Sequence, residues 1–105
     1  MKIGIIGLGF VGLSFASVLA SKDLDIIGID IDKEKLKIIK TGKSPFYEPN
    51  IDKTLQKALK KKLILSEKIE DAVNNCDLIF VTVGTPMSSD GTIDLEIILN
   101  VCKKI

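Results

Sequence analysis

Residues 1–16 read MKIGIIGLGFVGLSFA, and this stretch decides the fold. A short apolar run, Lys2–Ile6, is followed by three glycines within six residues, Gly7, Gly9 and Gly12. Glycine at such positions costs about 0.5–1 kcal/mol of backbone entropy relative to alanine. A strand joined to a helix by a GxGxxG turn needs these glycines when a phosphate must approach the backbone. The pattern therefore predicts a strand, a tight turn and a helix, in that order.

Each glycine has a separate role in the predicted turn. Gly7 permits the tight turn itself, Gly9 lets the backbone approach a pyrophosphate, and Gly12 lets the helix lie close to the strand. The free N–H groups of the first helical turn, near Phe10 and Val11, would point at the phosphates, and the helix dipole adds to the attraction. The turn is therefore predicted to bind the pyrophosphate of a dinucleotide.

Strand-type and helix-type segments alternate along the rest of the chain. The predicted strands are short apolar runs at Lys2–Ile6, Asp25–Ile29, Leu63–Leu65 and Leu78–Val83. The predicted helices are Leu8–Ser21, Lys33–Thr41, Ile51 to about Lys61, Glu67–Val73, and one starting near Leu95 with Asp94 as its N-cap. Strands separated by helices imply right-handed crossovers and a parallel sheet. The sequence thus predicts an α/β fold, a Rossmann-type doubly wound parallel sheet that is incomplete at about four strands.

A carboxylate at the end of the second predicted strand strengthens the dinucleotide interpretation. Asp30 follows Gly12 by 18 residues, close to the spacing expected for the acid that binds the adenosine ribose hydroxyls. Its alternative role is to cap the following helix, which Asp32 can do instead. A 2′-phosphate beside Asp30 would meet like charge costing roughly 3–4 kcal/mol at an effective dielectric constant near 20. The predicted cofactor is therefore NAD and not NADP.

The fourth predicted strand leads directly into the segment GTPMSSDG. In a doubly wound sheet the first and fourth strands flank the point where strand order reverses, and ligands bind at their C-terminal ends. We therefore expect Val83–Pro86 to face the dinucleotide beside Gly9–Val11. The Thr85 hydroxyl is expected to bond a ribose or phosphate oxygen, with a plain turn role before proline as the alternative.

Composition argues against several other classes of function. The 105 residues carry 15 Lys and Arg against 14 Asp and Glu, so no strong field favours nucleic acid or a membrane surface. The sequence has no histidine, and Cys76 and Cys102 lack metal-ligand spacing, so no metal site is predicted. The lysines at 60–62 lie at the C-terminal end of a predicted helix, where cations complement the dipole. Without a membrane-spanning stretch or a secretory leader, a cytoplasmic location is expected.

Five motifs stand in the order GLGFVGL, GIDID with Lys35 after it, GKSPFYEPNI, FVTVGTP and DGTIDL. They resemble the N-terminal domain of the UDP-glucose/GDP-mannose dehydrogenases across essentially the whole chain. Residues 42–51 are the most specific part, since a general Rossmann domain has no reason to carry them. This family oxidises the C6 hydroxymethyl group of a nucleotide sugar to a carboxylate with two NAD, so the resemblance implies a nucleotide-sugar substrate.

The resemblance also implies roles for individual residues in cofactor binding. It assigns a cofactor-binding role to the glycine loop and Val11, places Asp30 and Lys35 at the adenosine end of NAD, and places Thr85 near the other end. Lys35 lies one helical turn beyond the second predicted strand, from where its ammonium can reach ribose oxygens or offset negative charge. Its alternative role is that of an exposed lysine on a solvated helix. Many relatives have tyrosine in place of Phe10, so a hydroxyl-mediated contact is lost here.

The sequence departs from the family more seriously in its cysteines. The family's oxidation proceeds through a thiohemiacetal on a cysteine in a GxCxxxD-type motif of a later domain, and neither Cys76 nor Cys102 matches that motif. We therefore expect residues 1–105 to be the N-terminal part of an NAD-binding Rossmann domain, with the central dimerisation and C-terminal substrate domains absent. We expect this chain to bind NAD without turnover.

The sequence also indicates how the chain could associate with copies of itself, and it leaves two alternative functions open. The run LIFVTV at 78–83 would form an unpaired apolar sheet edge, so a homodimer or other association through that edge is expected. One alternative function is an NAD-sensing regulatory module of a potassium channel or transporter, which shares the GxGxxG start but lacks SPFYEPNI. The other is a dehydrogenase of a hydroxy acid or a 6-phosphogluconate-like substrate, which would share the cofactor half and differ mainly in that segment.

Overall fold

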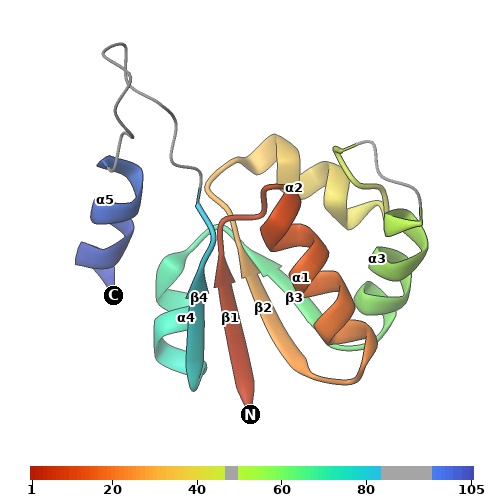
Figure 1. The fold of residues 1–105 in the computed structure, drawn as a ribbon, viewed down its shortest axis with the longest axis horizontal. Helices are drawn as coiled ribbons and strands as arrows, with labels where there is room; N and C mark the ends of the chain where they lie inside the picture. The colour runs from red at the N-terminus through yellow and green to blue at the C-terminus, as the bar shows by residue number, and fades with distance from the viewer. Residues whose placement is uncertain (47–49, 84–95) are drawn as a thin grey trace.

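A computed structural model describes residues 1–46, 50–83 and 96–105 of the chain (Figure 1). Its strands are β1 (Lys2–Ile6), β2 (Asp25–Ile29), β3 (Leu63–Ser66) and β4 (Leu78–Val81). Its helices are α1 (Phe10–Ser21), α2 (Lys33–Lys40), α3 (Ile51–Lys60), α4 (Ile69–Asn75) and α5 (Glu96–Lys104). Strands and helices therefore follow one another in the predicted order, including the successive helices α2 and α3.

Two helices begin later than the sequence predicts, and the local conformation of the residue before each helix explains both. α1 begins at Phe10 because Gly9, with φ −71° and ψ −168°, is an extended N-cap residue. α4 lies two residues further along than predicted. The Ser66 hydroxyl accepts a hydrogen bond from the N–H of Lys68 and holds a turn there, so Lys68 becomes the extended N-cap. The expected cap of α5, Asp94, lies outside the described residues.

The strands form one parallel sheet in the order β3-β2-β1-β4, which is the beginning of the Rossmann order 3-2-1-4-5-6. The register aligns Ile5 of β1 with Gly28 of β2 and with Phe80 of β4. β4 ends at Val81, two residues before its predicted end, because its partner β1 ends at Ile6. The predicted fold class is confirmed.

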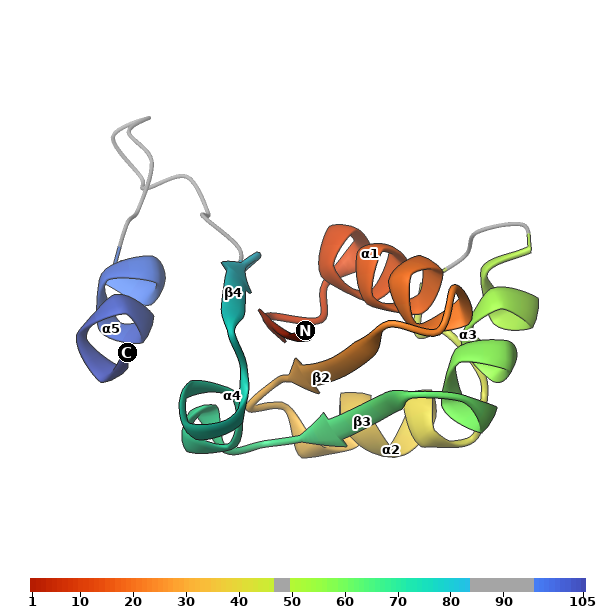
Figure 2. The same cartoon turned by 90° about the horizontal axis from the view of Figure 1, so that it is seen from below.

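Helices cover both faces of the two central strands (Figures 1 and 2). Ile3 and Ile5 of β1 belong to the core formed with α1, α2 and α3, whereas Ile6 packs on the opposite face with Ile29 and α4. Apolar residues on both faces are typical of parallel strands buried between helix layers. A ligand therefore reaches β1 and β2 at their C-terminal ends, where the chain turns towards α1 and α2.

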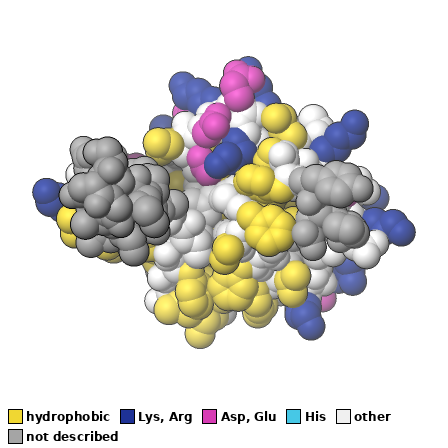
Figure 3. Space-filling view, turned by 45° about the horizontal axis from the view of Figure 1, so that its top comes forward, with side chains coloured by type: hydrophobic (Ala, Val, Ile, Leu, Met, Phe, Trp, Pro, Cys, Tyr) yellow, Lys and Arg dark blue, Asp and Glu magenta, His cyan; other side chains and the backbone are white. Residues whose placement is uncertain are grey.

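α1 is apolar on its outer side as well as on the side that faces the sheet. Leu13 and Ala16 are fully buried, while Val11, Phe15 and Val18 are exposed. Figure 3 shows apolar side chains reaching the surface on one face of the molecule. A helix that is apolar all round is typical of one that is covered on both sides. Among the described residues, none of the helices is long and apolar enough to cross a bilayer.

Candidate dinucleotide-binding site

A cavity of about 360 Å³ lies at the C-terminal ends of β1, β2 and β4. Isoleucine, valine and phenylalanine side chains form most of its wall, and the other lining residues are Gly7, Gly9, Asp30, Lys35 and Thr82. The glycine loop, Asp30 and Lys35 therefore line the same cavity, although they come from separate parts of the chain. An apolar cleft with a few convergent polar groups is the usual form of a cofactor site.

The backbone at Gly7 and Gly12 requires glycine for two different reasons. Gly7 has φ +101°, in the left-handed region that side chains rarely adopt. A Cβ on Gly12 would overlap the Gly7 carbonyl oxygen and come within 2.5 Å of Thr82 Oγ1. The tight turn at Gly7 and the close approach of α1 at Gly12 are therefore confirmed.

The N-terminus of α1 is open at the cavity. Among the described residues, no side chain caps the helix at Gly9, and the first N–H groups of a helix have no partner within it. A Cβ built on Gly9 would meet no atom within 4 Å. The side chains of Phe10 and Val11 are 47% and 67% exposed and do not line the cavity. The arrangement leaves backbone N–H groups, and room beside them, for an anion such as a phosphate.

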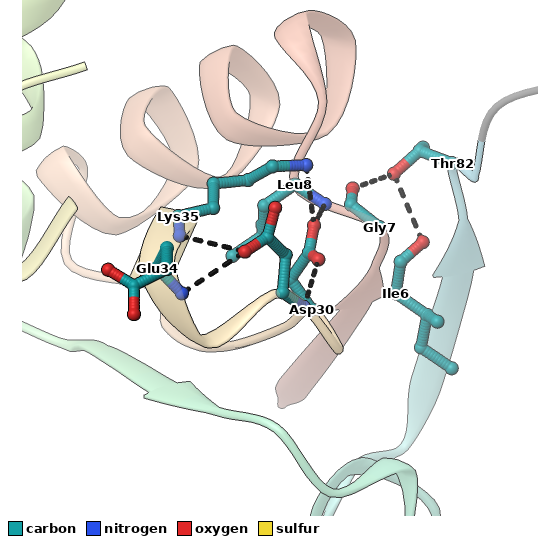
Figure 4. A network of polar contacts seen from close by, with 8 residues as sticks. Ile6, Gly7, Leu8, Asp30, Glu34, Lys35 and Thr82 are labelled. Carbon is teal, nitrogen blue, oxygen red and sulfur yellow. Dashed lines mark hydrogen bonds and ion pairs between the residues drawn. The ribbon is translucent and has the colours of Figure 1, made fainter. Parts of the chain in front are cut away.

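Asp30 joins the end of β2 to the glycine loop (Figure 4). Its Oδ2 accepts hydrogen bonds from the Leu8 N–H at 2.9 Å and from Lys35 Nζ at 3.1 Å, and its Oδ1 accepts one from the Asp32 N–H at 2.9 Å. The N-terminal cap of α2 is Asp32, which accepts from the N–H groups of Glu34 and Lys35. Helix capping, the alternative role for Asp30, therefore belongs to Asp32.

These contacts keep the Asp30 carboxyl ionised. Burial raises the pKa of Asp30. Hydrogen bonds from the Asp32 and Leu8 N–H groups and the ammonium of Lys35 lower the pKa, and together they outweigh the effect of burial. The net pKa lies below its ordinary value of 3.8. Because the pKa is lower in the folded chain than in the unfolded chain, the ionised carboxylate stabilises the fold at pH values above the unfolded pKa. This stability is lost as the pH falls through the folded pKa. At neutral pH the cavity presents a charged acceptor, which suits a ribose hydroxyl.

Lys35 lies in the first turn of α2, and its side chain is about three-quarters buried. Its ammonium is 3.1 Å from Asp30 Oδ2 and lines the same cavity. The prediction that Lys35 offsets local negative charge is therefore confirmed, and the exposed-lysine alternative is wrong. Contact between Lys35 and a ribose stays a prediction.

The segment after β4 is described only in part. Val83 lines the cavity as expected, while Thr85 and the rest of the GTP motif lie outside the described residues. Thr82, which the sequence reasoning missed, places its hydroxyl 2.6 Å from the Gly7 carbonyl oxygen. Its signal in the sequence was faint: Thr82 is a lone polar residue in the apolar run LIFVTV.

An aromatic contact connects the segment 42–46 to this site, a segment whose role the sequence left open. Phe46 lines the cavity, and its ring meets that of Phe10 edge-on, with centroids 6.2 Å apart. The start of the family-specific SPFYEPNI segment therefore lies beside the N-terminus of α1. Among the described residues, no group of three His, Cys, Asp or Glu side chains is placed to bind a metal ion.

The parallel sheet, the glycine turn and the acid after β2 define a dinucleotide-binding domain of the Rossmann class. Residues 1–105 match the family described as UDP-glucose/GDP-mannose dehydrogenase family, NAD binding domain. The chain belongs to this family, and its cofactor is NAD. The potassium-channel alternative gains no support from the comparisons.

Named relatives and solved structures agree with this membership. GDP-mannose 6-dehydrogenase from Pseudomonas syringae is 39% identical over 100% of this chain and 24% of its own length. UDP-glucose 6-dehydrogenase from Bacillus subtilis is 35% identical over 99% of this chain and 23% of its own. A ternary complex of GDP-mannose dehydrogenase from Pseudomonas aeruginosa has a TM-score of 0.96 at 37% identity, over 100% of this chain and 24% of that one. The chain thus spans about a quarter of the length of these relatives.

Proposed function

We propose that residues 1–105 provide the NAD-binding part of a nucleotide-sugar 6-dehydrogenase similar to UDP-glucose 6-dehydrogenase. The relatives at 39% and 35% identity named above are a GDP-mannose 6-dehydrogenase and a UDP-glucose 6-dehydrogenase. In the proposed reaction the C6 hydroxymethyl group of the sugar becomes a carboxylate. That oxidation removes two electron pairs and takes one oxygen atom from water, and bound NAD would supply a hydride acceptor for each pair, so two NAD would be used per sugar.

The observation that supports this proposal most is the position of Asp30 within the cavity. An ionised carboxylate has about four acceptor positions, and among the described residues three donors occupy Asp30: the N–H groups of Leu8 and Asp32 and the ammonium of Lys35. One position on Oδ1 is therefore available to a ribose hydroxyl without loss of any existing bond. A second hydroxyl can take the place of Lys35, whose ammonium then donates to a ribose oxygen.

The ratio of NAD affinity to NADP affinity tests the proposal, and the charge of Lys35 makes the expected ratio smaller. Because the ammonium lies 3.1 Å from the carboxylate, a 2′-phosphate would meet a nearly neutral pair instead of an isolated negative charge. We expect titration calorimetry to show NAD binding at least about tenfold more tightly than NADP, equivalent to about 1.4 kcal/mol. In Lys35→Ala the NADP affinity should fall further than the NAD affinity, so the ratio widens.

Lys33→Ala is the matched control for this titration. Lys33 lies on the same helix, pairs with Glu67 at 3.8 Å and does not line the cavity. Its removal should leave the ratio of NAD to NADP affinity unchanged. Equal affinities for the two cofactors in the unaltered chain would contradict the proposed role of Asp30, and a narrower ratio in Lys35→Ala would contradict that of Lys35.

Residues 1–105 alone are proposed to bind NAD without oxidising a sugar. A cysteine nucleophile must be an accessible thiolate. Burial raises the pKa of the Cys76 thiol, which disfavours the thiolate. The Cys76 side chain lies next to Gly4 and does not line the cavity. Cys102 is exposed on α5 and does not line the cavity either. Neither thiol is placed to attack a sugar beside the cofactor.

Copies of the chain are proposed to associate along β4. Within the described sheet β4 pairs only with β1, and its first residue, Leu78, is 43% exposed. An apolar strand with unpaired backbone groups favours pairing with another edge. We expect sedimentation equilibrium to show a dimer, and Leu78→Lys to shift it towards monomer because a charge would enter the contact. A monodisperse monomer of the unaltered chain would contradict this proposal.

A further inference from the structure

We propose that Thr82 is a positioning residue that fixes the glycine loop for the cofactor; this rests on the proposed function, NAD binding in this cavity. Thr82 follows β4, and its Oγ1 lies 2.6 Å from the Gly7 carbonyl oxygen and 3.3 Å from the Ile6 carbonyl oxygen (Figure 4). Both partners are carbonyls, so the hydroxyl must be the donor. It has one proton, and the shorter contact to Gly7 takes it.

Thr82 and Asp30 act on the two ends of one peptide group. The peptide bond between Gly7 and Leu8 carries the Gly7 carbonyl at one end and the Leu8 N–H at the other. Thr82 donates to that carbonyl at 2.6 Å, and Asp30 accepts from that N–H at 2.9 Å. The peptide group is therefore held between a residue after β4 and a residue after β2.

This hold fixes an orientation that the local sequence restrains only in part. The peptide group between Gly7 and Leu8 turns about ψ of Gly7 and φ of Leu8, and glycine at position 7, which lies at φ +101°, restrains its own side of the group less than a residue with a Cβ would. Turned the other way, the group would direct its carbonyl oxygen at the Asp30 carboxylate and its N–H away from it. The two side chains thus select one orientation of the loop before the cofactor arrives.

A fixed peptide group matters because the loop is where a pyrophosphate must come close to backbone N–H groups. A carbonyl oxygen that faced the cavity would repel the phosphate oxygens, and Thr82 holds this one at the β4 side of the turn. Loss of one neutral hydrogen bond that preorganises a site is expected to weaken binding about three- to tenfold.

The test compares Thr82→Val, which keeps the shape and removes the hydroxyl, with Thr82→Ser, which keeps the hydroxyl. Calorimetry should show NAD binding three- to tenfold weaker in the valine variant and close to the unaltered chain in the serine variant. Amide hydrogen exchange at Leu8 should be faster in the valine variant only, because the freed peptide group can turn away from Asp30. Thr82→Ala gives the same comparison with serine if the valine variant does not fold.

Each outcome has a distinct meaning. Unchanged NAD affinity in Thr82→Val would overturn the proposal, and so would an equal loss in the serine and valine variants, which would indicate a packing role. If the unaltered chain bound no NAD, the proposed function would fail instead. In that case Leu8 exchange would still decide whether Thr82 holds the peptide group.

Discussion

Replacing Asp30 with alanine is expected to weaken NAD binding by about 1–3 kcal/mol, roughly 5- to 150-fold. The variant loses the carboxylate that is proposed to accept from the ribose hydroxyls. It also loses the hydrogen bonds that Asp30 accepts from the N–H groups of Leu8 and Asp32 in the unaltered chain. Binding must then order a loop that the unaltered chain holds already ordered. Titration calorimetry of the two chains with NAD measures the difference.

Two further variants separate charge from shape and binding from folding. Asp30→Asn keeps a carbonyl oxygen as an acceptor but loses the charge that pairs with Lys35, so its NAD affinity should fall between those of the alanine variant and the unaltered chain. Asp32→Ala removes the cap of α2, which costs about 0.5–2 kcal/mol of folding free energy, and should leave the NAD affinity unchanged. An alanine variant at position 30 that binds NAD normally would exclude Asp30 from the site.

The parts of this site that could be predicted from the sequence are those that depend on neighbours along the chain. The positive φ of Gly7 and the crowding at Gly12 follow from a tight turn between a strand and a helix, and GxGxxG records that turn directly. Asp30 could be placed because a parallel β-α-β unit brings the end of its second strand beside the end of its first. These expectations needed only the order and length of two adjacent elements.

The parts that could not be predicted depend on contacts between distant segments. Thr82 is 75 residues from Gly7, and no local pattern tells which way a hydroxyl at the end of β4 will point. The ring of Phe46 against Phe10 likewise requires the path of the segment after α2, which the turn-rich sequence leaves open. The late start of α4 at Ile69 is the exception, because it depends on a local contact, the hydrogen bond from the Lys68 N–H to the Ser66 hydroxyl.

Alanine at Gly12 should destabilise the fold and alanine at Gly9 should leave its stability nearly unchanged, although both should impair NAD binding. At Gly12 a Cβ overlaps the Gly7 carbonyl oxygen and crowds Thr82 Oγ1. Overpacking of this kind costs about 1–3 kcal/mol or more, which exceeds the helix propensity that alanine gains over glycine, at most about 1 kcal/mol. Urea unfolding should therefore show Gly12→Ala to be destabilised, and its NAD affinity should fall because the turn is displaced.

At Gly9 the same substitution meets open space and a φ of −71°, which any residue adopts. As an N-cap, alanine costs less than about 1 kcal/mol relative to glycine, so urea unfolding should change little. Its methyl group, however, enters the cavity wall at the N-terminus of α1, where the pyrophosphate must approach, and calorimetry should show NAD binding weakened tenfold or more. Normal binding by Gly9→Ala would mean that no phosphate lies there, whereas normal stability of Gly12→Ala would mean that α1 does not need its close approach to Gly7. The two variants lie within one helical turn of each other, so together they distinguish the glycine that the fold requires from the glycine that the ligand requires.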